Sequence, residues 1–220
     1  MSCTALLLYY ICMIKYLLFD LDNTLYSCNY GLEDNVSRRI RDFAAEYLGI
    51  SPEEAWKMRV ANMSRYGTCL EWLMEEEGFT DAEAYFAAIH PEGEADSLPQ
   101  DDELRAFLAG IPIPKAILTN SPREHADLVL GKLGIGDLFT DIFDIRICSF
   151  VGKPRPEVFN HVAERLGLPA RDILFIDDNP CHVDGFTALG GAGLLIDENN
   201  IYQNYRGRKI GNIKELCQFI

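Results

Sequence analysis

Short apolar runs alternate with segments of helical periodicity along most of this chain. Runs of strand length span residues 16–19, 115–118, 142–147, 173–176 and 193–196. Helical spacing and helix-terminating glycines mark the segments between the later runs, and one more short helix is expected near the C-terminus. Buried strands that alternate with helices predict an α/β fold, a doubly wound parallel sheet with right-handed crossovers.

Residues 27–97 follow a different pattern, with strong helical signals and no convincing strand. Apolar side chains repeat at helical spacing over residues 32–47. Capping boxes at Ser51, Thr68 and Thr80 predict three more helices. A block of four helices directly after the first strand indicates an inserted all-helical cap and not a part of the sheet.

We therefore expect a core domain, a cap domain and an extra N-terminal segment. Residues 13–26 and 98–220 form the α/β core, and residues 27–97 form the cap. Residues 1–12 are interpreted as an extension that is not native to the protein. The apolar stretch over residues 5–14 is too short to span a bilayer.

Polar side chains gather where the predicted parallel strands end. The set comprises Asp20, Asp22, Thr119, Asn120, Asp177 and Asp178, and Lys153 precedes a helix in a loop at the same edge. Because the carboxyl ends of parallel strands lie along one edge of a sheet, these groups are expected to converge. An oxygen-rich cluster suits Mg²⁺ and does not suit zinc or copper. The cation and the lysine would offset the carboxylate repulsion and create a small positive pocket for a phosphate.

Charge and cysteine content limit the possible partners. The net charge of −14 argues against a nucleic acid polymer or an anionic membrane as a partner. The seven cysteines include no Cys-x-x-Cys pair, which favours reduced thiols in a cytoplasm over a disulfide framework. We expect a cytoplasmic monomer or homodimer that acts on a small molecule.

The strand-end residues resemble the four motifs of the haloacid dehalogenase-like phosphohydrolases, in the same order. The motifs are Asp20-x-Asp22, Thr119, Lys153 and Asp177-Asp178. The resemblance covers residues 14–197 and includes the position of the cap. It implies a Mg²⁺-dependent phosphomonoesterase.

The same resemblance assigns a role to each motif residue. Asp20 is the nucleophile that forms an aspartyl-phosphate, and Asp22 is the general acid and base. Phosphate binding falls to Thr119, Asn120 and Lys153. The metal residues are Asp20, Asp22 through its backbone carbonyl, Asp178 directly and Asp177 through water.

Three segments also look like the pyrimidine 5′-nucleotidase branch of that family. They are Asp20-Leu-Asp-Asn-Thr-Leu-Tyr, Arg65-Tyr-Gly-Thr-Cys-Leu, and Leu118-Thr-Asn-Ser with Arg123-x-His-Ala after it. The resemblance implies a substrate such as UMP or CMP. Tyr66 would stack on the base, and Thr68 would contact a polar edge or the sugar. Glu71-Trp72 departs from the pattern of that branch.

Other functions remain as alternatives. A phosphatase of sugar phosphates or phosphoglycolate would use the same core residues, and a phosphomutase would keep both acids. A dehalogenase would not need Asp22. A receiver-type phosphoacceptor module also uses an acid pair, a nucleophilic Asp, a Thr and a Lys around Mg²⁺, but the acid pair comes first there and no large helical insert is expected.

Histidine and tryptophan positions receive structural interpretations. The four histidines, His90, His125, His161 and His182, are not spaced as metal ligands and are expected at the surface or in packing. Trp56 and Trp72 occupy helical core spacing and are expected to be buried.

Overall fold

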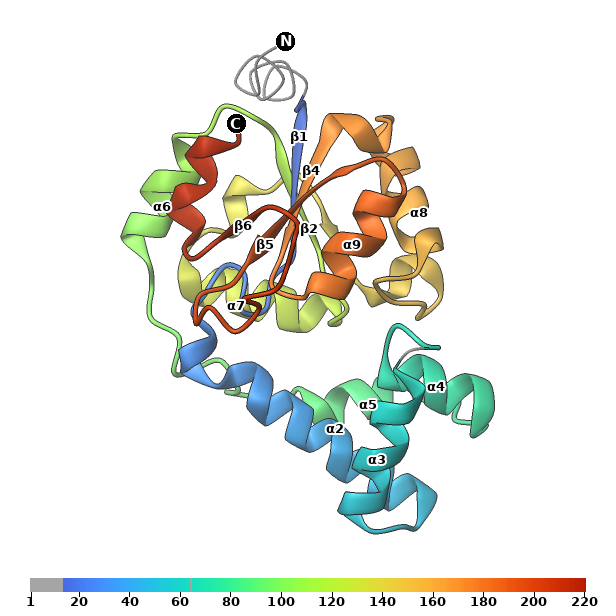
Figure 1. The fold of residues 1–220 in the computed structure, drawn as a ribbon. Coiled ribbons are helices and arrows are strands. Elements are labelled where there is room, and N and C mark those ends of the chain that lie inside the picture. The colour runs from blue at the N-terminus through green and yellow to red at the C-terminus, as the bar shows by residue number, and fades with distance from the viewer. Residues whose placement is uncertain (1–13, 64) are drawn as a thin grey trace.

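A six-stranded parallel sheet forms the centre of the molecule (Figure 1). The computed structural model describes residues 14–63 and 65–220, so the expectation for residues 1–12 lies outside the described part. The strand order is β3-β2-β1-β4-β5-β6. The strands are β1 (Tyr16–Phe19), β2 (Lys115–Leu118), β3 (Ile142–Phe143), β4 (Ile173–Asp177), β5 (Ala192–Ile196) and β6 (Lys209–Ile210).

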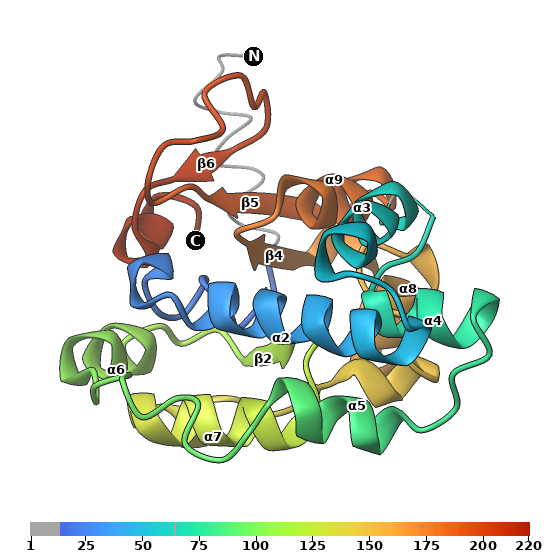
Figure 2. The same cartoon turned by 90° about the horizontal axis from the view of Figure 1, so that it is seen from below.

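Helices cover both faces of this sheet (Figure 2). Leu17 and Phe19 of β1 pack with α6 (Asp102–Ala109) and α7 (Arg123–Leu133) in one apolar cluster. Leu18 packs on the other face with α8 (Pro156–Leu166) and α9 (Pro180–Ala188). Alternate side chains of one strand thus point into two separate cores, as a doubly wound sheet requires.

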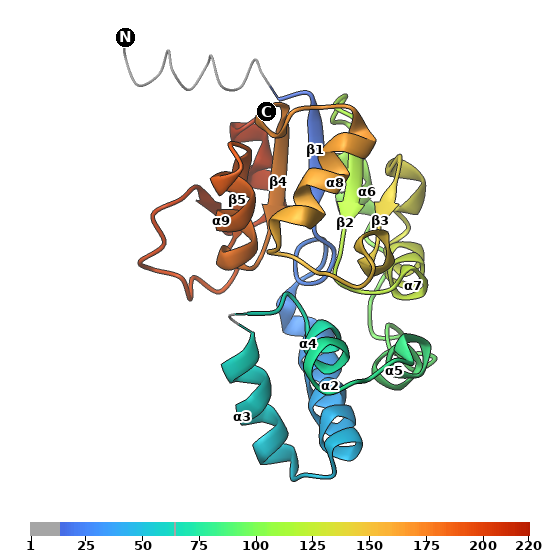
Figure 3. The same ribbon diagram turned by 90° about the vertical axis from the view of Figure 1, so that its right-hand side faces the viewer.

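The remaining four α-helices gather beyond the carboxyl ends of the strands (Figures 1 and 3). They are α2 (Leu32–Leu48), α3 (Pro52–Asn62), α4 (Cys69–Glu76) and α5 (Ala82–Ile89). We call residues 32–89 the helical lobe. Its apolar cluster is largely its own, with Trp72 and Leu73 among the fully buried side chains. The helical lobe therefore has a core apart from the two cores of the sheet.

Capping side chains determine where the lobe helices begin. Ser51 and Glu54 form the expected capping box. Thr68 accepts from the backbone N–H of Glu71, but the Glu71 carboxylate accepts from Gly67 instead of completing the box. The N-cap of α5 is Asp81, one residue after the expected Thr80. Asp and Thr are both good N-caps, so the sequence alone did not separate them.

The structure corrects three smaller expectations. The strand expected over residues 142–147 ends at Phe143, and a 3-10 helix follows it. Strand β6 was not expected, because two residues carry no readable periodicity. Trp56 is 45% exposed and not a core residue. The 3-10 helices are η1 (Cys28–Tyr30), η2 (Gly136–Leu138), η3 (Ile145–Cys148), η4 (Ala170–Asp172) and η5 (Ile213–Gln218).

Within residues 14–63 and 65–220, no helix combines the length and the apolar character needed to cross a bilayer.

Candidate active site

Asp20 lies directly after the central strand and is almost completely buried. Its Oδ1 is 2.5 Å from Nζ of Lys153, and the same Nζ is 2.8 Å from Oδ2 of Asp177. The Thr24 hydroxyl donates to the other Asp20 oxygen at 3.2 Å. Lys153 is only 1% exposed, so a buried cation joins carboxylates from β1 and β4.

The carboxylates at this edge carry more negative charge than Lys153 balances. Burial, opposed by Lys153 and reinforced by neighbouring acids, raises the pKa of Asp20 to about 7. Burial together with Asp177 and Asp20 raises the pKa of Asp178 to about 9. For Asp177, His182 and Lys153 outweigh burial and lower the pKa to about 2. Such raised pKa values mark carboxyls that another cation would stabilise in the charged form.

A divalent cation fits this donor set. Oxygen atoms of Asp20, Asp177 and Asp178 lie within 4.8 Å of one another. Carboxylate oxygens are the ligands that Mg²⁺ prefers. The three acids expected as metal ligands through their side chains are therefore brought together, and the chemistry of their atoms suits the metal.

Asp22 has a different environment from Asp20. Its Oδ1 accepts from the Tyr26 hydroxyl at 2.7 Å and lies 2.8 Å from Nε2 of His125, while Oδ2 accepts from Ser121 at 3.0 Å. Burial alone would raise the pKa of Asp22, but His125 and Tyr26 hold it well below its usual range. The two acids, two residues apart, are therefore distinguished by their surroundings.

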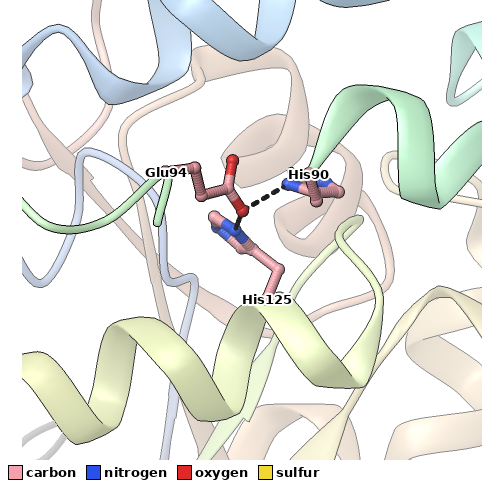
Figure 4. Close-up of side chains that lie close together, drawn as sticks. All are labelled: His90, Glu94 and His125. Atoms are coloured by element: carbon pink, nitrogen blue, oxygen red, sulfur yellow. Dashed lines mark hydrogen bonds and ion pairs between the residues drawn. The ribbon is translucent and has the colours of Figure 1, made fainter. Parts of the chain in front are cut away.

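His125 belongs to a buried cluster that the sequence analysis missed (Figure 4). Nδ1 of His125 is 2.6 Å from Oε1 of Glu94, and Nδ1 of His90 is 2.9 Å from the same oxygen. The facing carboxylates of Asp22 and Glu94 outweigh burial and raise the pKa of His125 to about 10. The sequence offered only one signal, the position of His125 in the first turn of the helix after Thr119.

His182 is a second histidine with an unexpected place. It lines the cavity above the site, and its Nδ1 is 3.1 Å from both carboxylate oxygens of Asp177. Asp177 also accepts from the backbone N–H of Asn179 at 2.8 Å. These contacts connect Asp177, the last residue of β4, to the first turn of α9.

Thr119 and Asn120, which directly follow β2, make different contacts from each other. Thr119 is buried beside the cavity, and its hydroxyl accepts from the Ser121 backbone N–H at 3.0 Å. Asn120, expected to bind phosphate, pairs both side-chain atoms with the backbone of Lys153, at 2.7 and 3.1 Å. The Asn120 side chain therefore positions the lysine loop, and a phosphate contact from this residue would have to come from its backbone.

A cavity of about 320 Å³ lies between this edge of the sheet and the helical lobe. Its floor includes Asp20, Lys153 and Asp178. The lobe contributes a mainly apolar wall with two charged side chains. That wall includes Glu33, Val36, Ile40, Arg59, Met63, Thr68, Leu70, Tyr85, Phe86 and Ile89.

Of the two residues expected to contact substrate from the cap, the structure brings only Thr68 to the cavity. Tyr66 is not among the described residues that line it. The Tyr66 hydroxyl donates to Glu76 at 2.7 Å, and its ring packs under the Arg65 guanidinium. Stacking of Tyr66 on a substrate is therefore not supported by this geometry, and Tyr85 is the lobe tyrosine that faces the cavity.

Glu71 and Trp72, the departure from the branch pattern, do not line the described cavity either. The Glu71 carboxylate accepts from the Gly67 backbone N–H at 2.7 Å, and Trp72 is buried in the lobe core. Both residues shape the loop that carries Thr68, so they act on the cavity only through that loop.

The helical lobe is closed onto the sheet at a contact between two glycines. A Cβ on Gly67 would lie 2.3 Å from the backbone oxygen of Gly152, and a Cβ on Gly152 would lie 2.5 Å from the Thr68 methyl. Arg155 adds a hydrogen bond to the backbone oxygen of Arg65 at 2.9 Å. This close approach brings the Thr68 loop to the residue before Lys153.

The chain is similar in sequence to known hydrolases. A model of the haloacid dehalogenase-like hydrolase family matches residues 14–190. Phosphate metabolism protein 8 of Saccharomyces cerevisiae is 29% identical over 195 residues, which cover 80% of this chain and 59% of that protein. The phosphoglycolate phosphatase of Pectobacterium atrosepticum is 29% identical over 187 residues, covering 80% of this chain and 77% of that one. This chain thus spans less than two thirds of the yeast relative.

Solved structures of similar fold include both phosphatases and dehalogenases. The HAD phosphatase from Thermococcus onnurineus has a TM-score of 0.59 at 20% identity, covering 92% of this chain and 96% of that one. The L-2-haloacid dehalogenase from Xanthobacter autotrophicus has a TM-score of 0.58 at 17% identity, covering 94% and 99%. At these identities the likeness concerns the fold alone.

Proposed function

Because this chain belongs to the haloacid dehalogenase-like hydrolases, we propose that it is a Mg²⁺-dependent phosphomonoesterase that works through an aspartyl-phosphate on Asp20. The observation that carries the proposal is the contrast between Asp20 and Asp22. One acid is held against Lys153 and the other against His125, at 2.5 and 2.8 Å. Two carboxyls with different surroundings suit two different roles.

The reaction proceeds in two steps. A carboxylate oxygen of Asp20 attacks phosphorus while the ester oxygen leaves with a proton from Asp22. The charge of a bound phosphate raises the pKa of a neighbouring carboxyl, which favours a protonated Asp22 at this stage. Asp22 then removes a proton from the water that hydrolyses the aspartyl-phosphate. Acid–base assistance of this kind contributes about 10²–10⁴-fold.

Phosphate binding depends on groups fixed around Asp20. Lys153 and Thr119 hold the phosphoryl oxygens, and Asn120 keeps the Lys153 loop in place. A bound Mg²⁺, held by Asp20, Asp178 and the Asp22 backbone carbonyl, with Asp177 acting through water, would neutralise negative charge on the phosphoryl group.

The lobe wall of the cavity favours a pyrimidine nucleoside 5′-monophosphate as substrate. Tyr85 and Phe86 offer aromatic surface for a base, while Arg59 and Glu33 offer polar groups for its edge. Burial and the nearby Asp22 raise the pKa of Glu33 to about 8, so a neutral Glu33 carboxyl can both donate and accept.

Phosphoglycolate is the second candidate, because a relative at 29% identity is named a phosphoglycolate phosphatase. Glycolate carries its own carboxylate and has no apolar surface. Arg59 would pair with that carboxylate, but Glu33 and the apolar wall would contribute nothing to it.

A side-by-side assay of kcat/KM with Mg²⁺ separates the two candidates. We expect UMP and CMP to exceed phosphoglycolate and sugar phosphates. Tyr85→Leu should lower kcat/KM for UMP much more than for 4-nitrophenyl phosphate, and Tyr66→Phe, outside the cavity, should leave both unchanged. Phosphoglycolate exceeding every nucleotide would reverse the substrate assignment, and no hydrolysis of any ester would overturn the phosphatase proposal.

A further inference from the structure

Asp22 is connected to the helical lobe by a continuous series of contacts whose middle side chains, His125 and Glu94, are buried. Asp22 Oδ1 lies 2.8 Å from Nε2 of His125, whose Nδ1 lies 2.6 Å from Oε1 of Glu94. The same Oε1 lies 2.9 Å from Nδ1 of His90, and Oε2 accepts from Arg39 at 2.8 Å. Arg39 belongs to α2 and His90 is the C-cap residue of α5, so Glu94 is held from the first and the last helix of the lobe.

Glu94 occupies a special place in the chain. It lies in the segment that returns from the helical lobe to α6, and its side chain is 1% exposed. The side chain of His125 is completely buried. Burying several ionisable groups adds little net stability compared with apolar packing. A role of Glu94 and His125 in orienting Asp22 therefore explains their burial better than a role in stabilising the fold.

The short contacts indicate hydrogen bonds and not a metal site. Ligand atoms at about 2.0–2.2 Å from a tetrahedral zinc ion lie roughly 3.3 Å apart. Here the two ring nitrogens lie 2.6 and 2.9 Å from one Glu94 oxygen. The other Glu94 oxygen already pairs with the Arg39 cation, which disfavours a second positive charge beside it.

The two Asp22 oxygens are not equivalent. Oδ1 is held by Tyr26 and His125 together, at 2.7 and 2.8 Å, whereas Oδ2 has only the Ser121 hydroxyl at 3.0 Å. Because Oδ1 already accepts two hydrogen bonds, a proton on that oxygen is disfavoured. The arrangement therefore fixes the carboxyl plane and leaves Oδ2 as the oxygen that exchanges a proton.

We propose that His125 is a positioning residue for the acid–base carboxyl of Asp22, and that Glu94 links its placement to the position of the helical lobe. The proposal rests on the phosphomonoesterase function proposed above. When the lobe is closed, Arg39 and His90 hold Glu94, Glu94 holds the ring of His125, and the ring holds Asp22. Movement of the lobe away from the sheet loosens this series.

Leaving-group dependence tests the proposal, because an ester with a good leaving group needs little help from an acid. His125→Asn keeps a donor near Glu94 but loses the reach to Asp22. It should lower kcat/KM for an alkyl phosphate such as glycerol 3-phosphate by about 10²-fold or more. The loss for 4-nitrophenyl phosphate should be less than about tenfold.

Two further variants keep the test independent of folding. His125→Gln retains a donor near the Nε2 position and should recover part of the alkyl phosphate activity. Glu94→Gln keeps the shape of the side chain and should give an intermediate leaving-group preference. His161→Asn on α8 is the matched control and should leave both activities and the Tm at wild-type values.

Several outcomes would overturn the proposal. Equal losses on both esters in His125→Asn, at an unchanged Tm, would assign the residue a structural role only. Stoichiometric zinc in the purified protein that Glu94→Gln abolishes would replace the positioning series by a metal site. A wild type active on both esters with an unaffected His125→Asn refutes this inference alone. A wild type inactive on both of these esters and on UMP refutes the proposed function, and the inference with it.

Discussion

At the residue scale, Asp20 and Asp22 show how two identical side chains acquire different chemistry. Asp20 is buried beside Lys153 and other carboxylates, whereas Asp22 is partly buried and faces His125 and two hydroxyls. Burial raises the pKa of Asp20 to about 7, whereas His125 moves the pKa of Asp22 in the opposite direction. A spacing of two residues in the sequence places both acids at the same site, and their different neighbours give them different pKa values.

Removing the charge of Asp20 should abolish turnover. Asp20→Asn keeps the size of the side chain but cannot accept the phosphoryl group. We expect kcat to fall by at least about 10³-fold, as loss of a nucleophile does in other covalent enzymes. Steady-state assays measure the loss, and circular dichroism should show an intact fold. Retention of a tenth of wild-type turnover would exclude the covalent route.

Asp22→Asn is the matched variant for the second step. It should lose much activity while phosphate from a good leaving group accumulates on Asp20, because hydrolysis of the intermediate lacks a base. Acid-quenched protein analysed by intact mass would carry one phosphoryl group. Absence of the adduct at every time point would argue against an aspartyl-phosphate.

The acids and Thr119 of the site could be predicted from the sequence because each lies at or just after the end of a strand. Strand ends in a parallel sheet meet by topology, so Asp20, Thr119 and Asp177 needed no knowledge of side-chain packing. Glu94 and His125 could not be predicted in the same way. Their contact joins a loop to a helix 31 positions later, and no periodic pattern marks it.

At the element scale, strands β1, β2, β4 and β5 were predictable because each is a short, mainly apolar run that is almost entirely buried. The two-residue strand β6 and the early end of β3 were not predictable, because pairing with a neighbouring strand defines them and amino-acid composition does not. The loop from Arg65 to Thr68 was expected to offer Tyr66 to a substrate. Instead, the Tyr66–Glu76 hydrogen bond and the Gly67–Gly152 contact hold this loop with the Tyr66 side chain outside the cavity lining.

Adding a methyl group to that loop should interfere with closure. In Gly67→Ala the new Cβ would meet the Gly152 backbone oxygen at 2.3 Å, where no flexible side chain can yield. We expect kcat/KM to fall at least about tenfold, about 1.4 kcal/mol of transition-state stabilisation. Thermal unfolding should change little, because the lobe core does not include this residue.

Gly131→Ala provides the matched control for that variant. Gly131 lies within α7, and a Cβ there meets nothing within 4 Å. Wild-type kcat/KM and an equal or higher Tm are expected, since alanine favours helix. If Gly67→Ala matched this control in kcat/KM, close approach of the loop would not matter for turnover.

The core between the sheet and α8 and α9 depends on one aromatic cluster. Phe175 of β4 is fully buried, with Phe159 and Phe186 rings at 5.4 and 5.5 Å. Phe175→Ala should lower the free energy of unfolding by about 3–5 kcal/mol. Urea denaturation measures the change, and a loss below about 1 kcal/mol would show that the site refills by repacking.

At the scale of the whole molecule, which has a net charge of −14, several carboxyls line one cavity. Three of them have raised pKa values, Asp20 at about 7, Glu33 at about 8 and Asp178 at about 9. Each binds its proton more tightly in the folded than in the unfolded chain. Without metal, their deprotonation therefore opposes folding as pH rises.

The Tm of the metal-free protein should fall as pH rises from about 5 to about 9. The expected fall is at least about 3 °C, the shift that about 1 kcal/mol produces in a domain of this size. Mg²⁺ should raise the Tm more at pH 9 than at pH 5, because it binds the charged carboxylates. Differential scanning fluorimetry with and without a chelator measures both trends. A metal-free Tm that rises over this range would contradict the sign.

Both chain connections between the sheet and the helical lobe pass beside the same carboxyl. The outgoing connection carries Tyr26 and the returning one carries Glu94, whose contacts through His125 end at Asp22. A rigid body attached at two nearby points rotates about the line that joins them. Displacement grows with distance from that axis, so the Thr68 loop would move farther than Asp22. The molecule can thus admit and expel ligands by a lever motion that leaves Asp20 on the sheet in place and loosens only the contacts that hold the Asp22 side chain.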